Sequence, residues 1–565
     1  MAGGSRWLRL AIYALFAAIL YLPGLGKPPL WEPDEGRYAE IAREMVISGD
    51  FVTPRDNWVR YFEKPPLIYW AEAGAIKMLG ASEFAIRMPA ALCTIGEVVV
   101  TAGLAEAMFG VSAGLLAAIA LATSPIVFGF GRFATLDPPL ALFLTAAIGA
   151  FYLASRFEDF AGGTGRRWFI ASAAMLALGT LAKGPVALFL GGAIALIWIL
   201  IEGRANEIPR MPWLWGIAVF CAIAIPWFAL AESRNPGFLR FFFIHEHLQR
   251  YVESREHANS LFFFVPIVIA GAWPWLFFVP AAVSQSQEFS ETRSNIRLLV
   301  IWFLVIFIFF SIPSSKLGGY ILPAIAPIAI AAGYALACLP SFQSARRIRI
   351  LGSFAIVNLI ASAAAIVTLT ISRRLEPGIE STGIAIAIAI GGGAMAAYLL
   401  AIRNPSPFAV AGPLLVAMLI TASMIGRLRV EAGSHFTYRE LGRAMRPYVA
   451  DGCAIGSYRH FVQALPFYSG GREILVEYRG ELEPFSGDPG ADGYFIRNQR
   501  ELETVWNSNR CVVLIVNRND LDSLTRALSP SPSMIACEGK KFAISNRPSK
   551  TPLVMGNCES RLQPD

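Results

Sequence analysis

Charged residues are scarce in this chain, and long apolar runs take their place. Charged side chains make up 16% of the 565 residues, whereas soluble domains carry about 25%. Hydrophobic side chains make up 55%, and the mean hydropathy is +0.51. This balance excludes a disordered or collagen-like chain. It also disfavours a wholly soluble enzyme, because the apolar runs are long enough to cross a membrane.

Lysine and cysteine are rare as well. Only 8 of the 48 basic residues are lysines. No block of basic residues with interleaved aromatics suggests a nucleic-acid partner, despite the net charge of +7. The seven cysteines are too few for a disulfide scaffold, and they include no Cys-x-x-Cys pair of the kind that binds zinc.

The apolar runs predict a polytopic α-helical membrane protein with about thirteen transmembrane helices. Arg6 and Arg9 precede the first run, which we interpret as a retained anchor because no small-residue cleavage site follows it. The predicted spans cover residues 10–26, 86–108, 111–131, 137–154, 168–182, 184–201, 211–231, 261–283, 296–311, 318–338, 350–371, 382–401 and 407–425.

Arginine indicates the orientation of these spans, because inner loops are enriched in basic residues. With the N-terminus inside, the predicted inner loops contain Arg156, Arg166, Arg167, Arg204, Arg210, Arg293, Arg297, Arg346, Arg347, Arg349 and Arg403. An odd number of spans then places the C-terminus outside. A miscount by one span would reverse the orientation of the tail.

The sequence predicts two domains, a transmembrane domain over 1–426 and an outer α/β domain over 427–565. The first contains two outer segments, 27–85 with amphipathic helices and 232–260. The tail alternates helix-like and strand-like stretches, which is typical of a small α/β domain. The helices are expected over 437–449 and 519–528, and the strands over 454–458, 473–478, 494–497, 511–517 and 541–545.

The first outer segment contains a polar helix start. Pro33 suits the first helical position, and Asp34 and Glu35 follow in the first turn, where the helix dipole favours an anion. Asp34, Arg37 and Tyr38 share one helix face. We predict that this start binds a ligand; the alternative is a well-capped interfacial helix with a solvated acidic start.

Other ionisable residues lie near the predicted outer mouth. Glu63 and Lys64 precede two prolines, and the alternative for them is a surface ion pair worth about 0–1 kcal/mol. Four basic or acidic residues and one tyrosine lie at span ends, and we predict that they contribute to a functional site. The alternative is that the long basic side chains only reach from the span to the polar membrane interface. These are Arg132, Asp137, Lys183, Lys316 and Tyr320.

The outer segment 232–260 carries His245, His247 and Arg250. A helix would place His247 and Arg250 on one face. Metal binding by Glu63, His245 and His247 stays open, although the two histidines point apart on a helix. We therefore assign no metal site and no required cofactor, and a divalent metal remains an alternative.

Six motifs together resemble the aminoarabinose transferases that modify lipid A, within the protein-O-mannosyltransferase-like C-type glycosyltransferase superfamily. The resemblance covers the first 330 residues by motif and the rest by layout. The motifs are Pro-Asp-Glu-x-Arg-Tyr (33–38), Phe-Glu-Lys-Pro-Pro (62–66), Arg-Phe-x-x-x-Asp (132–137), Lys-Gly-Pro (183–185), His-x-x-Arg (247–250) and Lys-x-x-x-Tyr-Ile-Leu-Pro (316–323). The Gly318–Gly319 pair departs from the family, which commonly carries bulkier residues there.

The resemblance implies a C-type glycosyltransferase fold in a bacterial inner membrane, with the active site and the C-terminal domain facing the periplasm. It implies inverting transfer of a sugar from a polyprenyl-phosphate carrier to a lipid acceptor similar to lipid A. Transfer to a protein or to another envelope glycan is the alternative. A transporter or lipid flippase is the alternative of another class, which the absence of a visible internal repeat disfavours.

The implied chemistry suggests a role for each residue. The leaving phosphate needs cations, with Lys64 and Arg250 as first choices and Lys183 and Lys316 as second. Asp34 is the candidate base for a hydroxyl acceptor. Glu63 would orient the sugar or hold a cation. The remaining predicted substrate-binding residues are Glu35, Arg37, Tyr38, Arg132, Asp137, His247 and Tyr320.

Four cysteines, Cys453, Cys511, Cys537 and Cys558, lie in the predicted outer tail. An oxidising compartment permits two disulfides among them, with three connectivities. We favour the Cys537–Cys558 pair, and the alternative is four free thiols.

Overall fold

The computed structural model describes residues 2–157, 163–249, 259–286, 290–371, 377–431, 436–485, 487–488, 491–548 and 554–556. The chain divides into two compact units. The helical unit comprises Met1–Gly24 and Ala90–Leu428, and the α/β unit comprises Leu25–Pro89 and Arg429–Asp565. The sequence placed 27–85 in the transmembrane domain, whereas in the structure this segment packs with the tail.

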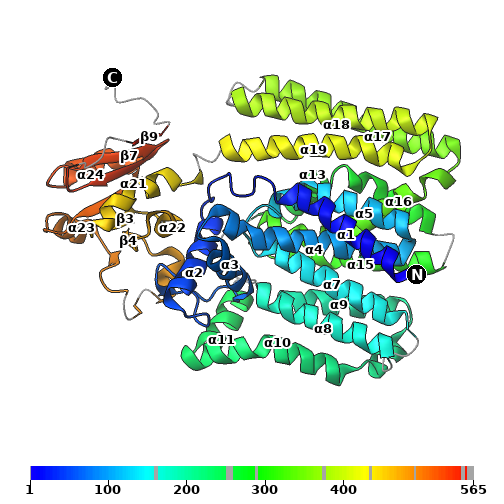
Figure 1. Cartoon of the computed structure of the whole chain (residues 1–565), viewed down its shortest axis with the longest axis horizontal. Coiled ribbons are helices and arrows are strands. Elements are labelled where there is room, and N and C mark those ends of the chain that lie inside the picture. The colour runs from blue at the N-terminus through cyan, green and yellow to red at the C-terminus, as the bar shows by residue number, and fades with distance from the viewer. Residues whose placement is uncertain are drawn as a thin grey trace. The chain divides into compact units, whose positions relative to one another are not determined.

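The helical unit is built from long apolar helices (Figure 1). Its main helices are α1 (Ala2–Tyr21), α4 (Glu83–Phe109, which begins in the α/β unit), α5 (Val111–Thr123), α6 (Pro125–Phe130), α7 (Asp137–Ser155), α8 (Gly163–Lys183), α9 (Val186–Ile201), α10 (Trp213–Arg234), α13 (Phe264–Gly271), α14 (Val279–Gln285), α15 (Ser290–Ser311), α16 (Ile325–Ala337), α17 (Ser344–Ile371), α18 (Pro377–Arg403) and α19 (Pro407–Glu431). Shorter elements are η1 (Ala205–Arg210), α11 (Phe238–Arg240), the π-helix η2 (Phe241–Gln249) and the 3-10 helices η3 (Trp275–Phe278), η5 (Gly318–Ala324) and η6 (Leu339–Ser341).

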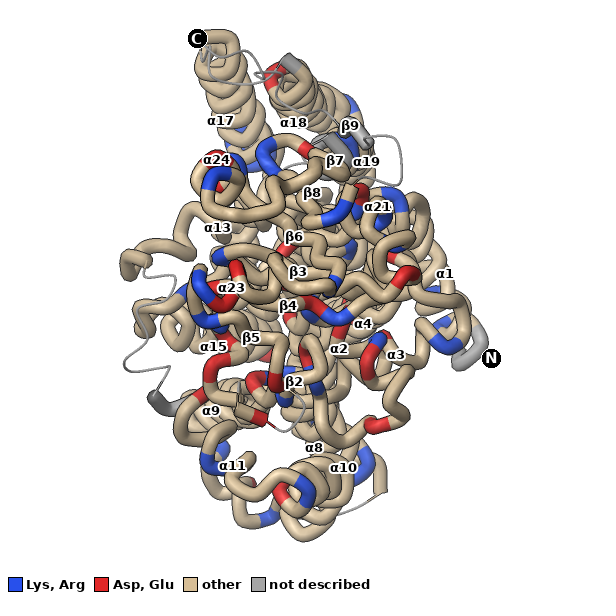
Figure 2. The backbone as a smooth tube through the Cα atoms, turned by 90° about the vertical axis from the view of Figure 1, so that its left-hand side faces the viewer, with Lys and Arg blue, Asp and Glu red and all other residues tan. Residues whose placement is uncertain are grey.

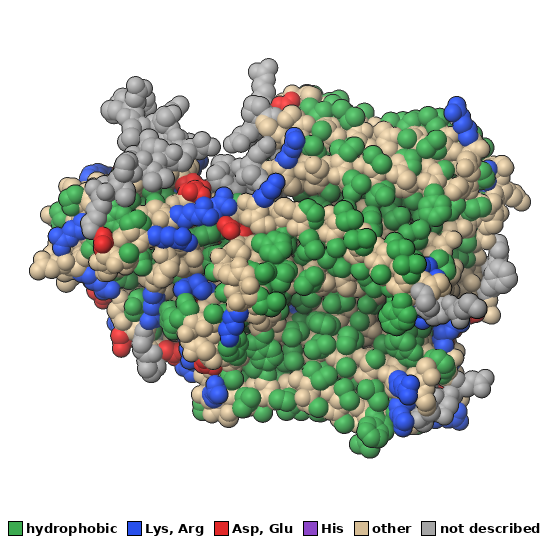
Figure 3. All heavy atoms as spheres, viewed as in Figure 1, with side chains coloured by type: hydrophobic (Ala, Val, Ile, Leu, Met, Phe, Trp, Pro, Cys, Tyr) green, Lys and Arg blue, Asp and Glu red, His purple; other side chains and the backbone are tan. Residues whose placement is uncertain are grey.

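The prediction of a polytopic helical membrane protein is confirmed. Every predicted span falls on one of these helices or on a consecutive group of them. In the described part of the chain, eight helices are long and apolar enough to cross a membrane, or nine if one bent pair counts as a span. The number of thirteen crossings therefore stays a prediction. Figure 3 shows hydrophobic side chains over most of the visible face of this unit.

Two predicted spans are interrupted in the structure. The run 111–131 ends one helix before Ser124 and starts another at Pro125. The run 261–283 bends by 91° between α13 and the η3–α14 segment, next to Pro274. Proline lacks the amide donor that a continuous helix needs and clashes with the preceding turn, so breaks at these positions follow from the sequence.

The charged residues of α7, α8 and α15 lie toward the ends of these helices. At one end, Arg297 Nη1 pairs with Glu202 Oε1 at 3.2 Å. Tyr152 also donates to Asn295 there, with Oη 2.9 Å from Oδ1. At the other end of α7 lies Asp137. Because α9 spans 16 residues, about 24 Å separate its two ends.

The α/β unit contains a seven-stranded sheet with strand order β5-β4-β3-β6-β8-β7-β9. Strands β3 to β6 pair in parallel, whereas β8 is antiparallel to both β6 and β7. The strands are β3 (Ala454–Tyr458), β4 (Glu473–Val476), β5 (Phe495–Ile496), β6 (Val512–Asn517), β7 (Ser533–Glu538), β8 (Lys541–Ser545) and β9 (Val554–Gly556). All five predicted strands are present, so the α/β prediction is confirmed.

Helices cover this sheet, and its central strands β3 and β6 are almost entirely buried. The helices of the tail are α21 (Arg439–Ala450), α22 (Leu465–Ser469), α23 (Gln499–Trp506), α24 (Arg518–Ala527) and the 3-10 helix η7 (Gly480–Phe485). The first outer segment adds α2 (Asp34–Ser48), α3 (Leu67–Leu79) and a hairpin of β1 (Arg55–Asp56) and β2 (Val59–Arg60). Figure 2 shows many of the charged residues gathered around these strands and around α2.

Cys453 and Cys511 form a disulfide. They precede the neighbouring strands β3 and β6, so the bond ties the centre of the sheet together. The alternative of four free thiols is therefore wrong. The predicted Cys537–Cys558 pair is not tested, because Cys558 lies outside the described residues.

Candidate active site

The start of α2 presents an exposed carboxylate that is held by a buried arginine. Asp34 lies in the first turn, and its Oδ1 accepts a hydrogen bond from Arg37 Nη1 at 3.3 Å. The Asp34 side chain is 39% exposed, whereas that of Arg37 is 11% exposed. The predicted shared face is thus present, and it combines an accessible acid with a fixed cation.

Glu481 holds the other side of Arg37. Its Oε1 accepts from Arg37 Nη2 at 2.8 Å and from Gln463 Nε2 at 2.5 Å. Burial raises the pKa of Glu481, and Arg37 counteracts part of that rise. Sequence reasoning missed both Glu481 and Gln463, because they come from η7 and from the loop after β3, and no local pattern marks them.

Glu35 is fully buried in an ion pair with Arg87. Its two carboxylate oxygens accept from Arg87 Nε at 2.7 Å and from Nη2 at 2.6 Å. The same guanidinium donates to the backbone carbonyls of Leu25, Pro28 and Pro29. The geometry therefore favours a structural role for Glu35 over the predicted substrate contact. The only sequence signal was the presence of a charged residue, Arg87, inside the predicted span 86–108, and it does not name Glu35 as the partner.

Gly36 allows α2 to approach the loop that carries Gln463. A Cβ atom at Gly36 would lie 2.6 Å from Ala464 N and 3.0 Å from Glu32 Oε1. The same Glu32 carboxylate accepts from the backbone N–H groups of Gln463 and Ala464. Burial raises the pKa of Glu32 to about 8, despite these hydrogen bonds. Glycine at position 36 thus fits the close approach that aligns the helix start with this loop.

Three further predicted residues lie in the same unit. Lys64 Nζ is 3.9 Å from Glu63 Oε2 and donates to the Glu63 carbonyl at 3.2 Å. Both side chains are partly exposed, at 24% for Lys64 and 15% for Glu63. Tyr38 is buried, with its ring centroid 5.8 Å from that of Tyr69. Lys64 and Glu63 can therefore reach a ligand, whereas Tyr38 packs inside the unit.

The helical unit brings three predicted residues together. Asp137 at the start of α7 forms an ion pair with Lys183 at the end of α8. Lys183 Nζ also lies 4.4 Å from the centroid of the Tyr320 ring. A Cβ atom at Gly319 would overlap the Asp137 carboxylate. Glycine at position 319 therefore leaves room for the Asp137 carboxylate.

Lys316 and Arg132 have backbone partners. Lys316 is 2% exposed, and its Nζ donates to the Asn259 carbonyl at 3.0 Å. Arg132 donates to the carbonyls of Leu20, Tyr21 and Pro23 at 2.7–3.1 Å. The last carbonyls of a helix lack partners within it, so Arg132 caps the end of α1. Substrate contacts by these two residues remain predictions.

The predicted histidine cluster is only partly described. Arg250 lies outside the described residues, and of His247 only the backbone within η2 is described. His245 Nδ1 is 3.3 Å from Glu246 Oε1, and its side chain is 58% exposed. Among the residues that the structure describes, no three His, Cys, Asp or Glu side chains are grouped as metal ligands would be.

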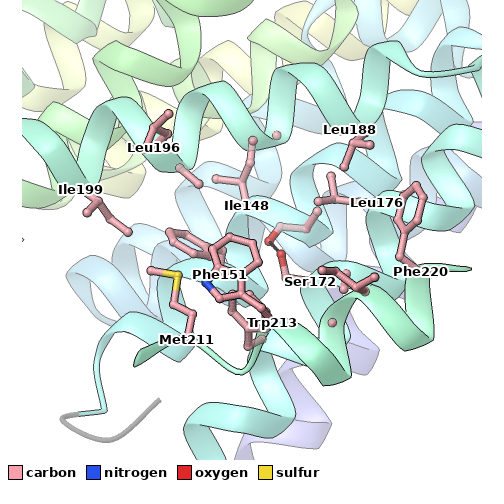
Figure 4. Close-up of a pocket in the computed structure, with 18 of the residues that line it drawn as sticks. Ile148, Phe151, Ser172, Leu176, Leu188, Leu196, Ile199, Met211, Trp213 and Phe220 are labelled. Atoms are coloured by element: carbon pink, nitrogen blue, oxygen red, sulfur yellow. Dashed lines mark hydrogen bonds between the residues drawn. The ribbon is translucent and has the colours of Figure 1, made fainter. Parts of the chain in front are cut away.

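An apolar cavity between α7, α8, α9 and α10 is a separate feature of the helical unit (Figure 4). Its volume is about 300 Å³, and none of the described side chains that line it is charged. The Ser172 hydroxyl donates to the Ala147 carbonyl. The cavity therefore offers no group that could bind a phosphate or activate a sugar acceptor.

Comparison with known proteins identifies the family. Residues 6–242 match the model of dolichyl-phosphate-mannose-protein mannosyltransferases, and residues 441–546 match the aminoarabinose transferase C-terminal domain. The undecaprenyl phosphate-alpha-4-amino-4-deoxy-L-arabinose arabinosyl transferase of Yersinia pestis (strain Pestoides F) is 34% identical over 379 residues. This alignment covers 66% of the present chain and 67% of the relative. The chain belongs to this family of arabinosyl transferases.

Other members and neighbours agree with this assignment. The transferase of the same name from Edwardsiella ictaluri is 34% identical over 336 residues, 58% of this chain and 59% of the relative. The crystal structure of ArnT from Cupriavidus metallidurans bound to undecaprenyl phosphate has a TM-score of 0.81 at 27% identity, covering 96% and 98% of the two chains.

The oligosaccharyltransferase AglB from Archaeoglobus fulgidus shares the fold alone. Its TM-score is 0.50 at 14% identity, covering 91% of this chain and 69% of that one. This arabinosyl transferase family member is thus a membrane glycosyltransferase with the C-type fold that its motifs predicted.

Proposed function

We propose that the protein transfers a sugar from a polyprenyl-phosphate carrier to a lipid acceptor similar to lipid A. The observation that carries this proposal is the exposed Asp34 carboxylate, fixed by Arg37 at the start of α2. The names of its relatives, which specify an undecaprenyl-phosphate-linked donor, support the choice of carrier. We further propose that the reaction takes place on the periplasmic side of a bacterial inner membrane.

The proposed reaction is a direct displacement. An acceptor oxygen attacks the anomeric carbon, and the bond from that carbon to the carrier phosphate breaks, so that the phosphate leaves with the electron pair. A hydroxyl acceptor loses its proton to Asp34, and Arg37 keeps this carboxylate oriented. A phosphate acceptor is already an anion and needs no base, so Asp34 would then orient the acceptor or the sugar.

Cations are needed for the leaving phosphate. Lys64 is the candidate in the α/β unit, because it is partly exposed next to Glu63. Lys183 is the candidate in the helical unit, where Asp137 and the Tyr320 ring position its ammonium group. Arg250 remains a prediction from the motif. Stabilising the charge that develops on the phosphate would be the main catalytic contribution.

Mass spectrometry of the cell envelope tests the proposed acceptor. A strain that lacks the gene should lose one sugar-bearing form of lipid A, and the parent gene should restore it. Loss of a sugar from a glycoprotein or another glycan instead would contradict the lipid acceptor. No glycan change, combined with altered uptake or export, would favour a transporter.

Purified protein with a polyprenyl-phosphate-linked sugar tests the residues. Asp34→Asn should lower the rate by about 100-fold or more, because it removes the general base or orienting charge. Lys64→Ala should chiefly raise the donor concentration needed for half-maximal rate. Asp522→Asn and Lys77→Ala are matched controls in the same unit, since Asp522 is exposed on α24 and Lys77 lies over the Phe51 ring. Parent-like rates in Asp34→Asn would remove this residue from the mechanism.

A further inference from the structure

A groove runs along α15 at the end of the helical unit that carries the Arg297–Glu202 pair. Its head is a cavity of about 420 Å³ lined by Ser286, Arg293 and Arg297 together with apolar side chains. Its tail is a cavity of about 130 Å³ lined by apolar residues of α14, α15, α16 and η3. The two cavities share four lining residues, Val283, Ile296, Val300 and Leu304. They therefore adjoin along α15 and together make a groove with a basic end and an apolar end.

The length of the groove matches one leaflet of a membrane. From Arg293 to Leu304 the helix advances by 11 residues (304 − 293), which is about 16 Å along the axis of α15. The hydrocarbon core of a bilayer is about 30 Å thick, so one leaflet contributes about half of that. Val300 and Leu304 are exposed in the structure, and the groove is therefore open along its side to a lipid chain.

The charge at the head of the groove favours an anion. Arg293 and Arg297 both line it, and guanidinium groups match the oxygens of a phosphate. Arg346 donates to Ser284 and Gln285 immediately before the lining residue Ser286, which adds a third cation to this end. Glu202 neutralises part of this charge through its pair with Arg297.

We propose that this groove binds an anionic phospholipid, with the phosphodiester at Arg293 and Arg297 and one acyl chain along α15. The inner-loop position predicted for these arginines assigns the lipid to the cytoplasmic leaflet. The groove lies at the opposite end of α9 from Lys183, about 24 Å away along that helix. It is therefore a different site from the proposed donor site, and the proposal does not depend on which sugar is transferred.

The apolar cavity of Figure 4 shows why the arginines matter to this assignment. That cavity also lies between helices, but no charged side chain is among its described lining residues. It could accept only a hydrocarbon chain and would not distinguish an anionic from a zwitterionic lipid. The groove on α15 joins both chemical features of a phospholipid in one place.

Native mass spectrometry of the delipidated full-length protein in detergent tests the charge. We expect phosphatidylglycerol to bind about tenfold more tightly than phosphatidylcholine, since basic residues at the membrane surface attract an anionic headgroup. The Arg293→Gln/Arg297→Gln variant should lose this preference. The matched control, Arg167→Gln/Arg210→Gln, removes the same charge from exposed positions outside the groove and should keep it.

A second pair of variants tests the apolar end. Leu304→Trp fills the groove and should weaken phosphatidylglycerol binding about tenfold, because the acyl chain loses its buried surface. Ile225→Trp, at an exposed position of α10 outside the groove, is the control and should bind as the parent does. Thermal unfolding in detergent, with a midpoint near that of the parent, verifies that each variant is folded. If the double arginine variant fails this check, Arg293→Gln alone takes its place and should lose part of the preference. If Leu304→Trp fails, Leu304→Phe takes its place and should weaken phosphatidylglycerol binding.

Three results would overturn the proposal. One is parent-like lipid preference in the Arg293→Gln/Arg297→Gln variant. Another is an equal loss in the Arg167→Gln/Arg210→Gln control, which would show a general effect of net charge. The third is displacement of phosphatidylglycerol by undecaprenyl phosphate together with loss of sugar transfer in Leu304→Trp, which would assign the groove to the donor. Because lipid binding is measured without any sugar donor, failure here leaves the proposed transferase reaction untouched.

Discussion

Arg37 donates a hydrogen bond to Glu481 across 444 positions of the sequence, with Nη2 2.8 Å from Oε1. The same guanidinium donates to Asp34. A residue of the C-terminal tail thus fixes the cation that orients the proposed catalytic carboxylate. The tail therefore contributes a residue, Glu481, to the proposed site.

Glu481→Gln should therefore lower the rate of sugar transfer by about tenfold, because a charged hydrogen bond to Arg37 becomes a neutral one. Initial rates at saturating donor measure this effect. Glu483→Gln is the control two residues away, where an exposed carboxylate pairs with Arg479. Equal rates in the parent and Glu481→Gln would show that Arg37 keeps its orientation without Glu481.

The Gly318–Gly319 pair allows a matched test in the helical unit. A Cβ at position 319 would overlap the Asp137 carboxylate, whereas at position 318 its nearest neighbour, the Ile267 side chain, is 3.9 Å away. Gly319→Ala should displace Asp137 from Lys183 and lower the rate by about tenfold or more, since small displacements at a reacting centre are costly. Gly318→Ala should react as the parent does. A similar loss in both variants would point to a backbone effect instead of Asp137.

Asp56 should make the stability of the α/β unit depend on pH. This side chain is fully buried, and burial raises its pKa well above the ordinary value. A carboxyl with a raised folded-state pKa stabilises the fold at acidic pH, and that contribution is lost as the pH rises toward the folded-state pKa. The midpoint of thermal unfolding should therefore fall less between pH 5 and pH 8 in Asp56→Asn than in the parent.

Asp50 provides the comparison of opposite sign. Burial acts to raise the pKa of Asp50, but hydrogen bonds from the Val52 and Thr53 amides, together with Arg55, outweigh it and lower this pKa. The stabilisation of the fold by ionised Asp50 is therefore present at neutral pH and is lost as the pH falls. Asp50→Asn should thus destabilise the protein near pH 7, and the difference from the parent should shrink as the pH falls below the ordinary pKa of an aspartate. A parallel pH response in Asp56→Asn and the parent would contradict the role given to Asp56.

Much of the fold was predictable because local patterns decide it. The strands at 454–458 and 541–545 were predicted with the observed ends, since each is a short apolar run between polar or glycine-containing turns. Charged positions at span ends likewise marked Asp137 and Lys183 as candidates, and the structure pairs the two side chains, while their catalytic roles stay predictions. The tail contributions of Gln463 and Glu481 were not predictable, because their relation to Arg37 exists only after residues 25–89 pack with the tail. Glu35 was assigned to substrate because a sequence does not show that Arg87 is its partner.

The disulfide between Cys453 and Cys511 tests the orientation of the protein. Disulfides persist in oxidising compartments, so this bond favours a periplasmic tail. The cysteines are 58 residues apart, and closing a loop of that size stabilises a domain by about 4 kcal/mol in the chain-entropy model. Cys453→Ser/Cys511→Ser should therefore lower the midpoint of thermal unfolding, and added reductant should lower that of the parent but change the variant less.

Thiol labelling in intact cells then decides the orientation itself. With a membrane-impermeant reagent, Cys453 and Cys511 should become reactive only after prior reduction, without opening the inner membrane. The control is a variant with serine at both positions, in which the reduction-dependent signal from this pair is absent. Residues 25–89 and the tail belong to one compact unit, so Asp34 and this disulfide face the same side of the membrane. Labelling only after the inner membrane is permeabilised would therefore place both on the cytoplasmic side and would contradict the thirteen-span prediction with the N-terminus inside.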